Sequence, residues 1–394
     1  MKTISFIIPS HNNLMYLKTA YNSIRKHHGY IHDIVMLDDA SEDGTWEWLK
    51  SIEQTDSNVQ IYRNKGPKKL GHTILYDIGV DMCTNNIFSI FHADMICSPM
   101  YVENLLKHLK EKTVVSATRI EPPLHPAGKE KIVMDFGLWP DEIKESEFLS
   151  FCEKKREEFK GVTTKGIFAP WLMYKKDFQA IGGHDPLFAP FPYEDSDIFN
   201  RFILAGYDII QSRDSFVYHL TCRGHRWTSG ELGKNDDMYP TYERNARRNY
   251  LRKWGSWIQN DEYLKPIISP KYNIGFIIHN CNLQILEMLE PWCSTIYTDE
   301  MYSIGRYQDY IEMEQSNTLF NLQERIQPIE NEKNNDILVE FNGSQLTNDG
   351  FQFLQQLPEI LKDSGESGEM EYDIFKITIN SLKTYEKDLV KCQK

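Results

Sequence analysis

The sequence predicts an α/β protein: a mixed, mostly parallel sheet flanked by helices, followed by a smaller C-terminal α/β domain. Strand-like apolar segments alternate with segments whose apolar residues recur at helical spacing, which is typical of a parallel sheet with both faces covered. The alternation resumes beyond about residue 265. Because single hydrophobic cores stop growing at about 250–300 residues, we expect the 394 residues to form two domains.

The first domain is expected to cover residues 1–236. Strands are expected at residues 4–9, 33–39, 58–64 and 86–94, and helices at residues 13–24, 43–52 and around 74–82. Each of these strands is bounded by polar or turn-forming residues, and the helices carry apolar residues three or four positions apart. Asp43 is the expected cap of the second helix, because a carboxylate accepts hydrogen bonds from a helix N-terminus.

The C-terminal part is expected to contain a connector and a second domain. Residues 237–265 are rich in aromatic residues and are expected to form a helical connector. Residues 266–394 again alternate strand-like and helix-like segments, which predicts a smaller α/β domain. Its sequence contains no recognisable catalytic constellation, so we assign this domain no role.

Composition excludes some classes of partner. The formal net charge of −13 argues against nucleic acid or an anionic membrane as the main partner. The seven cysteines are scattered and form no CxxC pair, which indicates reduced thiols in a cytoplasmic protein. No apolar run approaches the 18 or so residues of a membrane span, and Met1 leads directly into a strand without a signal peptide. We therefore expect a soluble protein.

Polar residues cluster where the predicted strands end. They are Ser10-His11-Asn12, Asp38-Asp39 and His92-Ala93-Asp94. Ligands of parallel sheets bind at the carboxyl ends of the strands, so these residues are expected to surround one site. His92 and Asp94 are two positions apart and on an extended chain would face the same way, as suits a metal or a pair of hydroxyl groups. A simple strand-to-turn junction is the alternative.

Phosphate-binding glycine loops are missing. The sequence lacks both GxxxxGK[ST] and, after the first strand, GxGxxG. If the sheet binds a nucleotide diphosphate, a divalent cation held by carboxylates is the economical way to neutralise it. A nucleotidyltransferase would need a glycine-rich basic loop after the first strand, and "PSHNNLMYL" contains neither glycine nor arginine.

Six sequence blocks in order carry a family resemblance. Over roughly residues 1–230 the chain resembles family 2 glycosyltransferases of the GT-A fold (nucleotide-diphospho-sugar transferases). The blocks are "FIIPSHNN", "VMLDDASEDGT", "NKGPKKLGHTILYDIG", "FSIFHADM", "GIFAPWLMYKKDFQAIGGHDPLF" and "PYEDSDIFNRFILAGYD". The resemblance implies a hexosyltransferase-like enzyme that moves a sugar from a nucleotide-diphosphate sugar, with a UDP-sugar favoured, to a glycan or other hydroxyl acceptor. It also implies inversion and Mn²⁺ or Mg²⁺.

The resemblance also assigns donor-binding residues. Pro9, Ser10 and Asp39, with Asp38 beside it, would contact the base and ribose, because a carboxylate accepts hydrogen bonds from base N–H groups and ribose hydroxyls. Alternatively, an aspartate here caps the loop before "SEDGT", and one of the pair is expected to do only that.

The metal ligands implied by the resemblance are Asp94 and His219. "HAD" stands where the family has its DxD motif, so His92 replaces the usual aspartate, and a neutral imidazole can ligate Mn²⁺ or bond a ribose. His219 ends an apolar strand, where related enzymes often place a metal-binding histidine. Alternatively, His219 binds no metal and forms a hydrogen bond to a backbone carbonyl at the end of the strand.

The segment after His219 carries cationic and aromatic residues. Arg223, His225, Arg226 and Trp227 offer guanidinium groups for a departing diphosphate and an aromatic face for a sugar. A solvated basic loop is the alternative.

An acidic turn supplies the expected general base. By resemblance Asp195 takes the acceptor proton, with Glu194 as the alternative and Asp197 as a helix-dipole partner. Asp185 either contacts the acceptor or holds its turn. The predicted function is therefore metal-dependent, inverting sugar transfer. A catalytically degenerate sugar-nucleotide or glycan-binding protein is the alternative.

Overall fold

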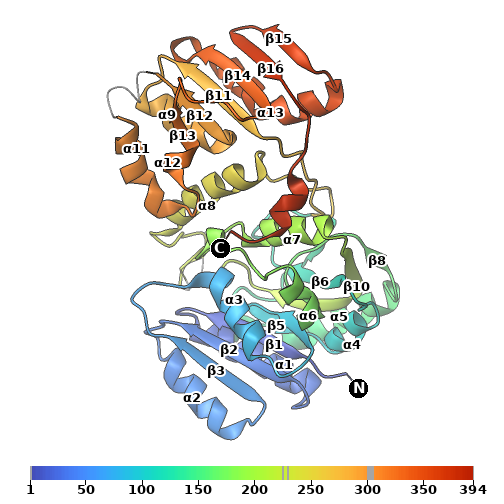
Figure 1. Cartoon of the computed structure of the whole chain (residues 1–394). Coiled ribbons are helices and arrows are strands. Elements are labelled where there is room, and N and C mark those ends of the chain that lie inside the picture. Colours follow the sequence, from blue (N-terminus) through green and yellow to red (C-terminus); the bar gives the residue numbers. More distant parts are fainter. Residues whose placement is uncertain (1, 224–225, 229, 300–305, 394) are drawn as a thin grey trace. The chain divides into compact units, whose positions relative to one another are not determined.

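The computed structural model describes residues 2–223, 226–228, 230–299 and 306–393. The chain divides into two compact units (Figure 1). The first contains Met1–Tyr242 and Asn260–Pro266, and the second contains Glu243–Gln259 and Ile267–Lys394. The expected connector is therefore shared between the two units.

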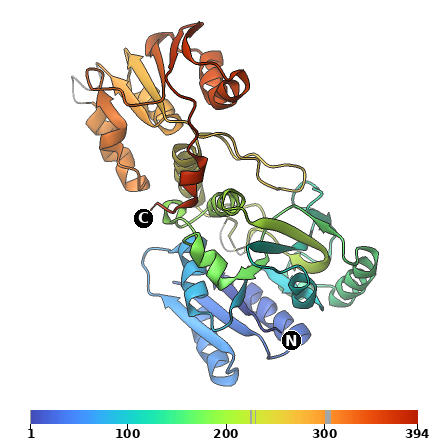
Figure 2. The same cartoon turned by 45° about the vertical axis from the view of Figure 1, so that its right-hand side comes forward.

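The first unit is a mixed, mostly parallel sheet flanked by helices, as predicted. Its strands are β1 (Ser5–Ser10), β2 (Asp33–Asp39), β3 (Val59–Asn64), β4 (Ile87–Ile90), β5 (Met95–Cys97), β6 (Thr113–Glu121), β7 (Lys131–Val133), β8 (Thr163–Thr164), β9 (Trp171–Tyr174) and β10 (Asp208–His219). The strand order is β3-β2-β1-β4-β9-β6-β10-β5, with β7 beside β6 and β8 beside β10. The blue strands β1–β3 lie side by side in both views (Figures 1 and 2).

Most neighbours in this sheet are parallel. Strand β9 runs antiparallel to β4 and β6, and β10 runs antiparallel to β5 and β8. The helices are α1 (Leu14–His28), α2 (Thr45–Thr55), α3 (Gly71–Met82), α4 (Tyr101–Leu106), α5 (Glu145–Glu158), α6 (Lys175–Ala180) and α7 (Glu194–Leu204), with short 3₁₀ helices η1 (Pro140–Glu142) and η2 (Pro186–Phe188).

Strand β1 is apolar on both sides because both faces of the sheet are covered. Successive side chains of a strand point to opposite faces. The Phe6 ring stacks on Tyr101 of α4, with ring centroids 6.0 Å apart. On the other face, Gly79 of α3 approaches so closely that an added Cβ would lie 2.3 Å from Ile7 Cγ2. The close contact explains why α3 has a glycine there.

Two local expectations need correction. Gly44, not Asp43, occupies the N-cap position of α2, and Asp43 Oδ1 instead accepts a hydrogen bond from the backbone N–H of Thr45 at 3.2 Å. The strand expected to reach residue 94 ends at Ile90, and the "HAD" motif lies in the connection to β5. The motif is therefore not extended, and strand pairing decides where Asp94 points.

The second unit is a smaller α/β unit with helices α8 (Tyr239–Trp254, which begins in the first unit), α9 (Leu283–Leu289), α11 (Tyr307–Glu314), α12 (Leu322–Arg325) and α13 (Asn348–Ser364). Its sheet has the order β13-β12-β11-β14-β16-β15. The strands are β11 (Ile274–His279), β12 (Thr295–Thr298), β13 (Ile326–Pro328), β14 (Ile337–Asn342), β15 (Gly368–Tyr372) and β16 (Phe375–Ile379), and the 3₁₀ helices are η3 (Glu290–Trp292), η4 (Gln315–Asn317), η5 (Gly343–Gln345) and η6 (Glu386–Val390). The four strands from β13 to β14 are parallel.

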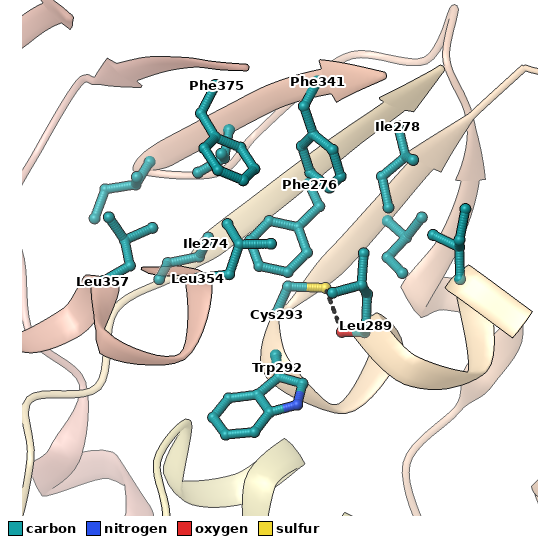
Figure 3. Close-up of a cluster of buried hydrophobic side chains, with 14 of the residues drawn as sticks. Ile274, Phe276, Ile278, Leu289, Trp292, Cys293, Phe341, Leu354, Leu357 and Phe375 are labelled. Atoms are coloured by element: carbon teal, nitrogen blue, oxygen red, sulfur yellow. Dashed lines mark hydrogen bonds between the residues drawn. The ribbon is translucent and has the colours of Figure 1, made fainter. Parts of the chain in front are cut away.

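A single apolar layer holds this unit together. Alternate residues of β11, including Phe276 and Ile278, share the layer with Phe341 of β14 and Leu354 and Leu357 of α13 (Figure 3).

In the part of the chain that the structure describes, no helix is long and apolar enough to cross a membrane. All seven cysteines carry free thiols.

A buried charge network lies beside this core. Glu290 is 0% exposed and accepts hydrogen bonds from Arg252 Nη2 at 2.7 Å, Arg325 Nε at 2.6 Å and the Tyr310 hydroxyl at 2.7 Å. Burial alone would raise the pKa of Glu290, but the two guanidinium groups lower it well below its usual range. The carboxylate is therefore ionised inside the unit.

We expect Glu290→Gln to lower the free energy of unfolding of the second unit by about 3–5 kcal/mol. The substitution leaves the guanidinium groups of Arg252 and Arg325 buried without the opposite charge of Glu290. Urea titration followed by tryptophan fluorescence measures this, with the exposed Glu366→Gln as control. Since folding lowers the pKa of Glu290, its contribution is present above about pH 4.3 and is lost as the pH falls below that value. A loss under about 1 kcal/mol at pH 7 would contradict the prediction.

Candidate active site

A pocket opens at the carboxyl ends of the strands in the first unit. It holds about 490 Å³ of space, open solvent included. The predicted site residues that line it are Pro9, Ser10, Asp39, His92, Asp94 and Arg223. Strands β1 and β2 end at its wall, as expected for a ligand site of a parallel sheet. Six of the nine residues proposed from the sequence therefore lie around one cavity.

His219 does not line the pocket, but strand pairing brings it next to Asp94, which does. Strand β5 runs antiparallel to β10, and its first residue, Met95, pairs with His219. The Leu220 N–H then donates to the backbone oxygen of Asp94 at 3.0 Å. This pairing brings the far end of β10 to the "HAD" turn.

His92, Asp94 and His219 form a triad of possible metal ligands. One ligand atom from each lies within 4.8 Å of the others. His219 Nε2 is 3.5 Å from Asp94 Oδ1 and has no hydrogen-bond partner among the described residues, although the residue is only 6% exposed. A buried nitrogen directed at a carboxylate without a hydrogen bond suits a bound cation. One carboxylate and two imidazoles favour a transition ion such as Mn²⁺ over Mg²⁺.

Charge in the triad is balanced by a proton when no cation is bound. Burial alone would lower the pKa of His219, but the carboxylates of Asp94 and Glu121 raise it to about 9. Burial would likewise raise the pKa of Asp94, but His219 and the Arg223 N–H lower it well below its usual range. A divalent cation would take the place of the His219 proton.

The two aspartates that end β2 have different surroundings. Asp39 Oδ1 accepts hydrogen bonds from Asn64 Nδ2 at 2.7 Å and the Leu70 N–H at 3.0 Å, and Oδ2 accepts from the Gly71 N–H at 2.8 Å. Gly71 has φ +71°, and a Cβ there would lie 2.2 Å from the Pro190 oxygen, so the position requires glycine. Asp39 thus shapes the pocket wall and retains one free lone pair on Oδ2.

Asp38 does not line the pocket. Its Oδ1 accepts from the Ser41 N–H at 2.9 Å, and Oδ2 lies 3.4 Å from Arg63 Nε. Asp38 therefore holds the following loop, as expected for one member of the pair. Of the two residues, only Asp39 lines the pocket.

Side chains at the end of β1 shape the opposite wall. The Ser10 hydroxyl donates to Asn13 Oδ1. His11 Nδ1 donates to the backbone oxygen of Asp39 at 2.6 Å, which links the ends of β1 and β2. Pro9 precedes them in the buried part of the strand.

Arg223 is a buried cation with unused donors. It is 3% exposed, and its Nη2 donates to the Leu138 oxygen at 3.0 Å. Nε and Nη1 have no hydrogen-bond partner among the described residues. The guanidinium lies 5.0 Å from the ring centre of Trp139. A buried guanidinium with free N–H groups at a pocket wall is suited to an anionic ligand. Arg226 is exposed, and His225 lies outside the described residues.

The acidic turn begins α7. Asp195 is part-buried, and burial together with the neighbouring Glu194 carboxylate raises its pKa to about 7. Glu194 Oε1 lies 3.8 Å from Nδ1 of His72. Asp197 is fully buried and accepts from Arg201 Nε at 2.7 Å, which gives it a structural role. Asp195 is not among the residues that line the pocket wall.

The nearby GGHD turn is held by aspartates. Asp185 accepts from the Leu187 N–H at 3.0 Å and so caps η2. Asp77 accepts from both the backbone N–H of His184 at 3.1 Å and its Nδ1 at 2.7 Å.

Several residues in and around the pocket have no role predicted from the sequence. Lys69 and His72 line the pocket, and His72 stacks on His92 with ring centroids 5.7 Å apart. Both belong to the block "NKGPKKLGHTILYDIG". Glu121 bonds His219 Nδ1 at 2.9 Å. A carboxylate at the end of an apolar segment, as in Asp38-Asp39, was the available signal for Glu121.

Comparison with known proteins agrees with this architecture. Residues 5–178 match the family model described as Glycosyl transferase family 2. This match falls within the first unit and agrees with the family resemblance found in the sequence. An uncharacterized glycosyltransferase of Haemophilus influenzae is 25% identical over 114 residues, covering 29% of this chain and 35% of that protein.

Two further similarities are distant. The uncharacterized protein y4gI of Sinorhizobium fredii is 25% identical over 244 residues, covering 57% of this chain and 25% of that protein. The matches thus span about a third and a quarter of the curated relatives. A crystal structure of GalNAc-T7 with UDP, GalNAc and Mn²⁺ has a TM-score of 0.45 and 15% identity, covering 64% of this chain and 48% of that chain.

We expect Arg223→Met to weaken binding of a nucleoside diphosphate such as UDP by about tenfold or more, because each hydrogen bond to a charged group contributes about 1.5–3 kcal/mol. The free energy of unfolding should change by no more than about 1 kcal/mol, because the loss of the hydrogen bond to the Leu138 oxygen and of contacts with aromatic rings is offset by removal of two unpaired buried nitrogens. Calorimetric titration and urea denaturation measure the two effects. Arg226→Met is the matched control. Equal UDP affinity in both variants would exclude Arg223 as an anion ligand.

Proposed function

We propose that this chain is a metal-dependent, inverting glycosyltransferase, hexosyltransferase-like, that moves a sugar from a nucleotide-diphosphate sugar to the hydroxyl of a glycan or another acceptor. The observation that carries the proposal is the triad of His92, Asp94 and His219, two of which line the same pocket as the buried cation Arg223. Cation ligands and a guanidinium with free donors together suit a diphosphate, which needs its negative charge neutralised from two sides.

The donor would lie across the ends of β1, β2 and β10. Asp39 would accept from an N–H group of uracil or guanine or from a ribose hydroxyl, and a UDP-sugar is the favoured donor. Arg223 would donate to the phosphate oxygens. A divalent cation held by Asp94, His219 and His92 would supply Lewis-acid stabilisation of the leaving diphosphate.

Asp195 is the proposed general base. The acceptor oxygen attacks the anomeric carbon, the bond from that carbon to the diphosphate oxygen breaks, and the acceptor proton passes to the Asp195 carboxylate. A raised pKa near neutrality makes a carboxylate a better proton acceptor while it stays largely ionised above about pH 7. Attack opposite the leaving group inverts the anomeric configuration.

A degenerate binding protein remains the second candidate, because the triad holds only one carboxylate. Incubation of the full chain with UDP-sugars and Mn²⁺ separates the two functions. Release of UDP, with transfer of the sugar to water or an added glycan, supports the enzyme. Saturable UDP-sugar binding without any release of UDP supports the binding protein and overturns the proposed activity.

Donor binding should require a divalent cation, with Mn²⁺ more effective than Mg²⁺. A ligand at 100 times its dissociation constant stabilises a protein by about 2.7 kcal/mol, so a thermal-shift panel of UDP and GDP with each cation reports binding. Asp94→Asn should abolish the shift, because an amide is a weaker ligand. His92→Asp, the matched variant, should retain or strengthen it. An unchanged shift in the presence of a chelator would contradict the metal requirement.

Asp195→Asn should lower turnover by about 10²- to 10⁴-fold, the usual contribution of a general base, while leaving UDP affinity unchanged. In the wild type, kcat/KM should rise as the pH passes about 7, because the base must lose its proton. Coupled assay of UDP release and NMR of the product anomer measure these effects.

Glu194→Gln is the matched comparison. If Glu194→Gln shows the larger loss of turnover, the base is Glu194. Retention of the anomeric configuration in the product would overturn the inverting mechanism itself.

A further inference from the structure

We infer that Glu121 is a positioning residue, which holds the His219 imidazole so that Nε2 is presented to the cation. The inference rests on the proposed metal-binding triad. It goes beyond that proposal because it names a residue outside the triad that decides which nitrogen of His219 is available and where it points.

Sheet geometry places Glu121 beside His219. Glu121 is the last residue of β6 and His219 the last residue of β10, and these parallel strands pair Ile120 with Tyr218. The Glu121 Oε1 atom accepts from His219 Nδ1 at 2.9 Å. Glu121 is 2% exposed, so water does not compete for this hydrogen bond.

Two cations keep Glu121 in place and ionised. Oε1 also accepts from Arg119 Nη1 at 2.8 Å, and Oε2 accepts from Lys131 Nζ at 2.8 Å. Arg119 and Lys131 are themselves largely buried, so two cations neutralise the Glu121 carboxylate by direct contact. The carboxylate is therefore an acceptor only.

The hydrogen bond selects the tautomer of His219. Because an ionised carboxylate cannot donate, the proton must sit on Nδ1, and in the neutral ring the lone pair is then on Nε2. Nε2 is the nitrogen that lies 3.5 Å from Asp94 Oδ1. A carboxylate behind a ligating histidine orients the ring and increases its basicity as a ligand. Without Glu121, both tautomers and other ring orientations are accessible.

The alternative is that Glu121 only neutralises Arg119 and Lys131. Glu130 provides the matched control, because it is 7% exposed and its Oε1 lies 3.6 Å from Arg119 Nη2. Replacing Glu130 by Gln removes a buried carboxylate from the same charge cluster without removing the partner of His219.

The experiment titrates Mn²⁺ into the full chain and follows free Mn²⁺ by electron paramagnetic resonance. Glu121→Gln should weaken Mn²⁺ binding by about 10- to 100-fold, the usual effect of removing the partner of a ligating histidine. Glu130→Gln should change it by no more than about twofold. Electron spin echo envelope modulation detects the ¹⁴N nuclei of imidazoles bound to Mn²⁺. It should report one fewer coordinated imidazole in Glu121→Gln than in the wild type.

A double-mutant cycle separates positioning from structural support. In a His219→Ala background, Glu121→Gln should have less than about a twofold further effect on Mn²⁺ affinity, because Glu121 acts through His219. Glu121→Asp, which keeps the charge, provides the same cycle if Glu121→Gln does not fold. Additive effects, or an unchanged nitrogen signal, would overturn the inference. Absence of Mn²⁺ binding to the wild type would overturn the metal triad and, with it, this inference.

Discussion

The candidate site depends on the contact between Asp94 and His219, which exists because β5 pairs antiparallel with the end of β10. This pairing places the Asp94 carboxylate, which lies in the connection between β4 and β5, against the imidazole of His219, the last residue of β10. In the free protein the contact is an ion pair with a proton on His219, whose pKa is raised to about 9. A divalent cation bound between the two side chains would replace that proton.

Several buried polar groups around this contact lack hydrogen-bond partners among the described residues, which lowers the stability of the free protein. His219 Nε2 and two nitrogens of Arg223 are buried and have no hydrogen-bond partner among the described residues. Such groups cost free energy unless a ligand satisfies them. In the second unit, by contrast, the buried carboxylate of Glu290 accepts hydrogen bonds from Arg252 and Arg325. The Glu290 cluster therefore stabilises its unit. His219 and Arg223, in contrast, keep hydrogen-bonding capacity that a charged ligand could use.

Neighbouring residues divide structural and ligand-facing roles. Asp38 and Asp39 are adjacent in β2, so their side chains leave the strand on opposite sides. One holds the loop after the strand, and the other faces the pocket. In α7 the buried Asp197 pairs with Arg201 one turn later, while Asp195 is part-buried and has a raised pKa. In both cases the role follows from direction and burial, not from residue type.

The sequence by itself determined the α/β architecture, the polar strand ends around Ser10 and Asp39, and the resemblance of the first unit to family 2 glycosyltransferases, because the alternation of apolar segments and the short motifs are local properties. It could not decide between Asp38 and Asp39, nor show that "HAD" lies in a turn, nor connect Glu121 to His219. Those outcomes depend on which strands become neighbours in the sheet. Strand order joins segments far apart in the chain, such as β5 with β10 and β6 with β10, and only the tertiary structure supplies it.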